Sequence, residues 1–169
     1  MRNLPWTPLV IIVTMLFVAV FAPVIAPHSP FDQTLADKLI PPFWEEGGST
    51  KYLLGTDVFG RDVFSRLLYG ARVSMIVSAL ALTVGGGVGL VIGIVSGYVG
   101  GRLDNLLMRI VDAALAFPAI LFALLLAVTM GQGLRTIVIA ISLLLWARFA
   151  RVVRGEVLAV KQRDFVALA

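Results

Sequence analysis

Long runs without a charged side chain constrain this sequence more than any other feature, because a chain must keep such runs away from water. Three runs contain no Asp, Glu, Lys or Arg: residues 9–25, 73–101 and 113–134. Each is close to or longer than the roughly 20 residues that cross the hydrocarbon of a bilayer as a helix. They predict an all-α integral membrane protein.

A fourth uncharged run, residues 136–147, is too short to cross the hydrocarbon unaided. Arg135 and Arg148 flank it and can extend their guanidinium groups toward the two headgroup regions, and Trp146 suits an interface. We therefore expect about four transmembrane helices, with a re-entrant or buried segment as the alternative for this run. Residues 9–25 also fit a signal peptide, but proline follows each small-residue cleavage site at once, which favours an uncleaved helix.

Composition agrees with a membrane protein and excludes several kinds of site. Hydrophobic residues make up 59% of the 169 residues and charged residues only 14%, against about 25% in soluble domains. The chain has no cysteine and a single histidine, His28, so thiolate chemistry and a histidine-rich zinc site are excluded. No phosphate-binding glycine loop and no hydrolase motif is visible. We expect no catalytic, cofactor-binding or metal-binding residue and no enzyme activity.

The placement of Lys and Arg predicts an orientation. With the N-terminus in the cytoplasm, the inner segments carry the larger share of the basic residues, including Arg148, Arg151 and Arg154 in the tail. These three arginines suit contact with anionic lipid headgroups. Nucleic acid is not expected as a partner, although the net charge of the chain is +4. The bias is moderate, since Arg61, Arg66 and Arg72 fall on the outer side.

Residues 27–72 read as a polar loop, because prolines, glycines and charges are concentrated there. Its last part, residues 57–72, is predicted to form an amphipathic helix at the membrane surface. The apolar positions that give this pattern are Val58, Phe59, Val63, Phe64, Leu67 and Leu68.

A glycine stripe marks the second uncharged run. Positions four residues apart lie on one face of a helix, and a face without side chains lets another helix approach closely. The stripe consists of Gly85, Gly89, Gly93 and Gly97, preceded by Ala81. It predicts tight helix packing, either within the same chain or in a dimer. Gly86 and Gly87 should make this helix easy to bend.

Two residues of the third run are candidates for a translocation path. Pro118 removes a helical hydrogen bond to the carbonyl of Ala114 and predicts a kink, although such kinks are also common in ordinary membrane helices. Asp112 is expected near the inner start of this span, where a carboxylate is a functional candidate. The alternative for Asp112 is a salt bridge with Arg109 or a position at headgroup depth.

Residues 54–74, with the sequence LGTDVFGRDVFSRLLYGARVS, resemble a signature of dipeptide and oligopeptide ABC importer permeases, in particular the C-type subunit. The signature residues are Gly55, Thr56, Asp57, Gly60, Arg61, Asp62, Ser65, Arg66, Gly70, Ala71 and Arg72. The later parts of the chain that are similar to the same family are residues 96–109, 112–118 and 146–156. Residues 1–53 resemble the N-terminal extension of this subunit, so the predicted domains are 1–53 and 54–169.

The resemblance implies a six-helix type I importer permease, of which about four helices are present here. It also implies that the tail begins the coupling loop, the "EAA" motif, which docks on an ATPase subunit. The residues concerned are Arg163, Asp164, Phe165, Val166, Ala167, Leu168 and Ala169. Ala167 stands where many members carry the glutamate of the motif. The chain is interpreted as a C-terminally truncated permease.

The resemblance further implies a multi-pass protein of a bacterial-type inner membrane that works by alternating access. Its expected partners are a B-type permease subunit, two cytoplasmic ATPase subunits, an external substrate-binding protein and the lipid membrane. Peptides are the commonest cargo of the family, but nickel complexes and other small solutes use similar permeases. The alternative is a non-transporting membrane scaffold or an inactive permease fragment, for which the glycine stripe would be an association face.

Overall fold

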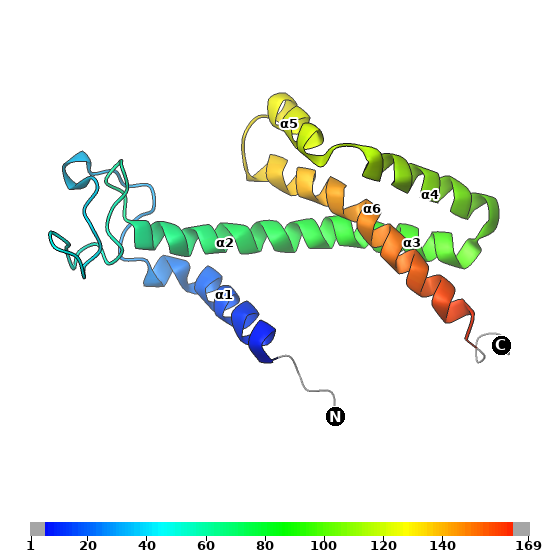
Figure 1. Ribbon diagram of the computed structural model, residues 1–169, viewed down its shortest axis with the longest axis horizontal. Helices are drawn as coiled ribbons and strands as arrows, with labels where there is room; N and C mark the ends of the chain where they lie inside the picture. The colour runs from blue at the N-terminus through cyan, green and yellow to red at the C-terminus, as the bar shows by residue number, and fades with distance from the viewer. Residues whose placement is uncertain (1–5, 164–169) are drawn as a thin grey trace. The chain divides into compact units, whose positions relative to one another are not determined.

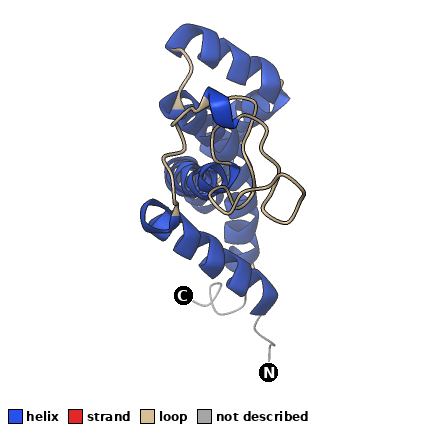
Figure 2. Cartoon of the chain, turned by 90° about the vertical axis from the view of Figure 1, so that its left-hand side faces the viewer, coloured by secondary structure: helices blue, strands red, loops and turns tan. Residues whose placement is uncertain are grey.

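The computed structural model describes residues 6–163, and these fold into helices joined by loops and turns (Figures 1 and 2). Short 3₁₀ and π-helical segments, η1 (Leu35–Asp37) and η2 (Leu82–Gly86), supplement six α-helices. The α-helices are α1 (Trp6–Ile25), α2 (Val63–Ala81), α3 (Gly87–Val99), α4 (Gly101–Ala116), α5 (Ala119–Met130) and α6 (Leu134–Lys161).

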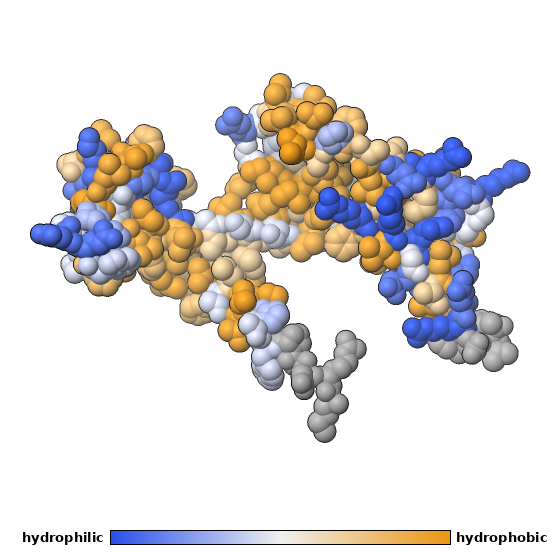
Figure 3. All heavy atoms as spheres, in the orientation of Figure 1, coloured by the Kyte–Doolittle hydropathy of each residue, from blue (hydrophilic) through white to orange (hydrophobic). Residues whose placement is uncertain are grey.

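Three helices are long and apolar enough to cross a membrane: α1, the continuous helix Val63–Val99, and α6. The pair α4 and α5 makes a fourth candidate span that is bent by 81°. This confirms the predicted all-α membrane fold with about four spans. Apolar residues cover much of the visible helix surface, whereas hydrophilic residues gather in the α1–α2 loop and near the end of α6 (Figure 3).

Contacts divide the chain into two compact units, Met1–Ile76 and Val77–Ala169, so the boundary falls in the sequence of α2. The first contains α1 and the polar loop, and the second contains η2, α3, α4, α5 and α6. This division follows spatial contacts and does not test the domain boundary at residues 53 and 54, which stays a prediction.

The helix expected over residues 57–72 is different in the structure. Residues 57–62 form turns, and α2 begins only at Val63. The carboxylate of Asp62 caps the new helix, accepting hydrogen bonds from the amides of Phe64 (3.2 Å) and Ser65 (3.2 Å). The predicted helix was therefore wrong for residues 57–62, whereas residues 63–72 are helical and continue without a break through η2 into α3.

Pro118 ends a helix instead of kinking one. A proline disfavours the helical conformation of the residue before it, and Phe117 is extended, with φ −76° and ψ 130°. As a result α4 stops at Ala116 and α5 starts at Ala119. Because α4 begins as early as Gly101, Asp112 lies well inside this helix, and its position near the inner start of the third span stays a prediction.

The short fourth run belongs to a much longer helix, since α6 continues to Lys161. Its small residues Ala147 and Ala150 pack with Val111 of α4 into a buried core, against which Ile92 and Trp146 also pack. A single turn of two glycines joins α3 to α4, and both Gly100 (φ 69°) and Gly101 (φ 62°) adopt a backbone conformation that other residues rarely take.

Candidate functional site

The glycine stripe packs against α6 of the same chain, with the two backbones in direct contact. We call this contact the seam; its glycines are Gly85, Gly89, Gly93 and Gly97. A Cβ atom on Gly89 would lie 2.4 Å from the carbonyl oxygen of Trp146 and 2.5 Å from the Cβ of Phe149. A Cβ on Gly87, in the same helix, would meet nothing within 4 Å. Only hydrogen fits at the seam, so α3 and α6 are locked together by shape.

A largely buried polar cluster lies beside the last glycine of the seam. It consists of Ser96 of α3, Asp104 of α4 and Arg154 of α6, whose side chain is 31% exposed. The Asp104 side chain is almost fully enclosed, and Ser96 is fully buried. Arg154 donates to both carboxylate oxygens, from Nε to Oδ1 and from Nη2 to Oδ2, at 2.6 Å each. The Ser96 hydroxyl also donates to Oδ1. A carboxylate taken out of water needs such partners, and this cluster supplies them from two other helices.

Two further cations of α6 contact the same pair of helices. Lys161 Nζ donates to the backbone carbonyl of Tyr98 at 2.9 Å, close to the C-terminal end of α3. Arg151 pairs with Asp112 of α4, and both side chains are exposed. The alternative of a local Asp112–Arg109 bridge was therefore wrong, because the nearest cation comes from another helix. Arg154 likewise binds a carboxylate of another helix, that of Asp104.

The signature residues build a rigid turn in the first unit. Asp57 Oδ1 accepts hydrogen bonds from the amides of Phe59 (2.9 Å) and Arg61 (3.0 Å), and Oδ2 accepts one from Arg61 Nε at 2.8 Å. Arg66 also donates to Oδ2. Partial burial alone would raise the pKa of Asp57, but the two amides and the Arg61 guanidinium outweigh it and lower the pKa to about 2. The carboxylate is thus the centre that organises the turn.

Gly60 closes this turn with φ 71°. A Cβ there would lie 1.9 Å from the carbonyl oxygen of Thr34, so glycine is required for both backbone angle and space. Gly55 is constrained in the same way, with φ 76° and the carbonyl oxygen of Ile40 2.3 Å from a Cβ position. In contrast, Gly70 on α2 has open space around it.

A second hydrogen-bonded cluster in the first unit connects the segment after α1 to the start of α2. His28 Nδ1 lies 3.3 Å from Asp62 Oδ2, and the His28 amide donates to Ser65 Oγ at 3.1 Å. The Ser65 hydroxyl donates to Asp62 at 2.5 Å. The Asp62 carboxylate therefore joins the segment after α1 to the first turn of α2. Thr56 supports the same loop by accepting a hydrogen bond from the Ile40 amide at 2.9 Å.

Two family models match this chain. The model of the N-terminal TM domain of oligopeptide transport permease C matches residues 4–42, and that of the binding-protein-dependent transport system inner membrane component matches residues 89–169. The dipeptide transport system permease protein DppC of Bacillus subtilis is 40% identical over 165 residues, 98% of this chain and 50% of the relative. Its Escherichia coli counterpart is 43% identical over 158 residues, 94% and 53% of the two chains.

This chain belongs to the peptide-type ABC importer permeases. It spans about half the length of the curated relatives it matches. A third relative, the glutathione transport system permease protein GsiD of an Escherichia coli strain, is 36% identical over 165 residues, 98% of this chain and 53% of the relative. Membership in this family, together with the apolar helices, makes the chain a multi-pass membrane protein.

Other permease residues singled out in the sequence lie apart from the seam and the cluster. Ala71 and Arg72 lie on α2, like Gly70. Arg163 is exposed just after the end of α6, whereas residues 164–169 of the expected coupling loop lie outside the described residues. The structure therefore leaves the ATPase contact a prediction, but it shows that α6 leads directly into that segment.

Sequence reasoning placed Ser96, Asp104 and Arg154 in the family pattern without bringing them together as a site. One signal was present, because Asp104 is one of only two carboxylates between two strongly apolar stretches and such a residue needs a cation. The choice among the basic residues of the tail could not be made from spacing alone, because Asp104 and Arg154 are 50 residues apart.

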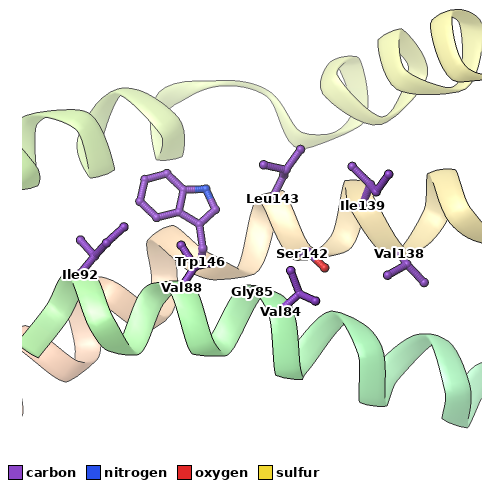
Figure 4. A pocket seen from close by; sticks show the side chains of 9 residues that line it. All are labelled: Val84, Gly85, Val88, Ile92, Val138, Ile139, Ser142, Leu143 and Trp146. Atoms are coloured by element: carbon purple, nitrogen blue, oxygen red, sulfur yellow. The ribbon is translucent and has the colours of Figure 1, made fainter.

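An apolar pocket of about 490 Å³ opens beside the seam (Figure 4). Its lining residues are Val84, Gly85, Val88, Ile92, Val138, Ile139, Ser142, Leu143 and Trp146. No charged side chain is among them, so the pocket suits apolar groups and not the charged termini of a peptide. The Ser142 hydroxyl is buried and has no hydrogen-bond partner among the residues that the structure describes.

Proposed function

We propose that this chain is a membrane-spanning part of the permease of an ATP-driven importer for short peptides. The observation that carries the proposal is the match along 94–98% of the chain to permeases named for dipeptide transport, at 35–43% identity. A relative named for glutathione transport, at 36% identity, adds another small peptide to the class of proposed cargo. Peptides of two or three residues are therefore the proposed cargo.

Transport would proceed by alternating access between inward-open and outward-open states, with ATP shifting their populations. The chain offers parts suited to such a change. The seam joins α3 and part of η2 to α6. Helix geometry is interrupted at two places, the π-helical segment η2 and the break at Pro118. We propose that Pro118 and Asp112, which is exposed on α4, lie along the translocation path.

The proposed assembly contains a B-type permease subunit, two cytoplasmic ATPase subunits and an external substrate-binding protein. Residues 163–169 would contact the ATPase, which places the C-terminal tail and the N-terminus in the cytoplasm. The distribution of Lys and Arg supports this orientation. The signature turn around Asp57 would then face the outer side, where the binding protein docks.

Copurification tests this proposal. The tagged chain, extracted from its own membrane in a mild detergent, should bring with it an ATPase subunit and a second permease. A matched chain that ends after Gln162 should keep the second permease and lose the ATPase. Recovery of the intact chain without any ATPase, under conditions in which the second permease is retained, would refute the role.

A further inference from the structure

Polar contacts, in addition to apolar packing, hold the end of α6 to α3 and α4. Arg154 and Lys161 are seven residues apart, close to two helical turns, so both point from one face of α6. On that face Arg154 reaches the buried Asp104, and Lys161 reaches the carbonyl of Tyr98. The last carbonyls of a helix lack helical partners, and Lys161 supplies one for α3.

The geometry at Asp104 restricts movement in a specific way. Two parallel hydrogen bonds from one guanidinium fix both distance and orientation, unlike a single contact between point charges. The hydroxyl of Ser96 holds the carboxylate from the α3 side. Three helices therefore meet at a single buried carboxylate, and α6 cannot slide or rotate there without breaking a partly buried charge pair.

A second ion pair between the same helices provides an internal comparison. Arg151 and Asp112 also join α6 to α4, but their side chains are exposed to 55% and 63%. Side-chain exposure at Arg154 and Asp104 is only 31% and 11%. Exposed pairs contribute little because water competes for both partners. The less exposed pair is therefore the stronger of the two links between α4 and α6.

We propose that Arg154 is a positioning residue for energy coupling in this permease. Held by Asp104 and Ser96, it makes the end of α6 move together with α3 and α4 when the segment beginning at Arg163 is displaced. The inference rests on the proposed function, in which that segment contacts an ATPase. Without this link the end of α6 could follow the ATPase while α3 and α4 stay behind, and ATP would be hydrolysed without transport.

The test uses the complete complex in liposomes with its binding protein, and measures dipeptide transported per ATP hydrolysed. The main variant is the double substitution Asp104→Asn with Arg154→Gln, which leaves no unbalanced buried charge. The matched control is Arg151→Gln alone, which breaks the exposed ion pair between the same two helices and leaves Asp112 unchanged. Ser96→Ala is a milder variant that removes only one hydrogen bond and keeps the test possible if the main variant fails to assemble.

We expect the ratio to fall about fivefold or more in the main variant, the lower end of ordinary coupling between sites. Ser96→Ala should lower it less, and the control should stay within about twofold of the parent. The proposal is overturned if the assembled variants, Ser96→Ala included, keep the parental ratio, even when they are less stable. A parent complex that binds no ATPase or does not transport would instead refute the proposed function.

Discussion

The signature turn and the seam both require glycine, but for different physical reasons. At Gly60 the backbone itself is unusual, with φ 71°, and the Thr34 carbonyl fills the space of a side chain. At Gly89 the backbone is ordinary α-helix, and only the neighbouring helix excludes a Cβ. The turn is shaped by its own chain geometry, whereas the seam is shaped by what packs against it.

The two regions also use charge in opposite ways. The turn is organised by the Asp57 carboxylate, which collects amide and guanidinium donors. The seam contains no charge, because lipid offers little hydrophobic drive for helices to associate and close backbone contact must supply the attraction. Charged side chains lie only beside the last seam glycine, Gly97, where Asp104 pairs with Arg154. The turn should therefore respond to pH, and the seam to side-chain volume.

The largest effect is expected from Gly89→Leu. Four carbons cannot enter a space where a Cβ already lies 2.4 Å from a carbonyl oxygen, so α3 and α6 must separate. Overpacking of this kind destabilises by about 3 kcal/mol or more. Unfolding in detergent measures the loss, and Gly87→Leu, which faces open space, is the matched control. Equal stability of the two variants would show that the seam is not a tight contact.

A smaller loss is expected in the turn from Gly60→Ala. The positive φ and the nearby Thr34 carbonyl should together cost about 2 kcal/mol. Gly70→Ala is the control, since alanine in an open helical position gains up to about 1 kcal/mol. Thermal unfolding compares the two, and a Gly60→Ala variant as stable as Gly70→Ala contradicts the strained turn.

The charge of Asp57 predicts a pH dependence confined to the turn. Its pKa in the folded chain, about 2, lies below the ordinary value of 3.8, so the carboxylate stabilises the turn fully above about pH 4. This stabilisation should be lost as the pH falls from about 4 to 2. Hydrogen exchange at the amides of Phe59 and Arg61 reports it. The variant Asp57→Asn should lack this pH step, and a step of the same size in both proteins speaks against the assignment.

The smallest effect is expected at the exposed pair of Arg151 and Asp112. Removing either charge should change the free energy of unfolding by less than about 1 kcal/mol, and added salt should reduce even that. Detergent unfolding of Asp112→Asn at low and high salt checks this. A loss of several kcal/mol would mean that this pair is protected from water in the membrane.

The spans and the spacing of the seam glycines could be read from the sequence because each depends on a local pattern. Uncharged runs report a need for lipid, and a four-residue period reports one face of a helix. The boundaries were less predictable. Pro118 gave a complete break, since Phe117 and Pro118 both left the helical conformation. The helix expected from residue 57 began only at Val63 and continued into the second span.

Pairings between helices could not be predicted, because spacing says nothing about which distant residue lies opposite. Asp112 had a cation three residues away in Arg109, yet it pairs with Arg151, 39 positions distant. Asp104 could have been matched with any basic residue of the tail. The packing of α6 on α3 selects Arg154, so this part of the site needed the three-dimensional structure.

The central claim is that this chain works in an ATP-driven importer of short peptides. Accumulation of radiolabelled dipeptide by liposomes that contain the purified complex, its binding protein and ATP tests it most directly. The account predicts uptake that requires ATP hydrolysis, that survives in the Gly87→Leu complex and that disappears in the Gly89→Leu complex. Uptake that is equal with ATP and with a non-hydrolysable analogue, or no uptake from a fully assembled complex, would contradict it.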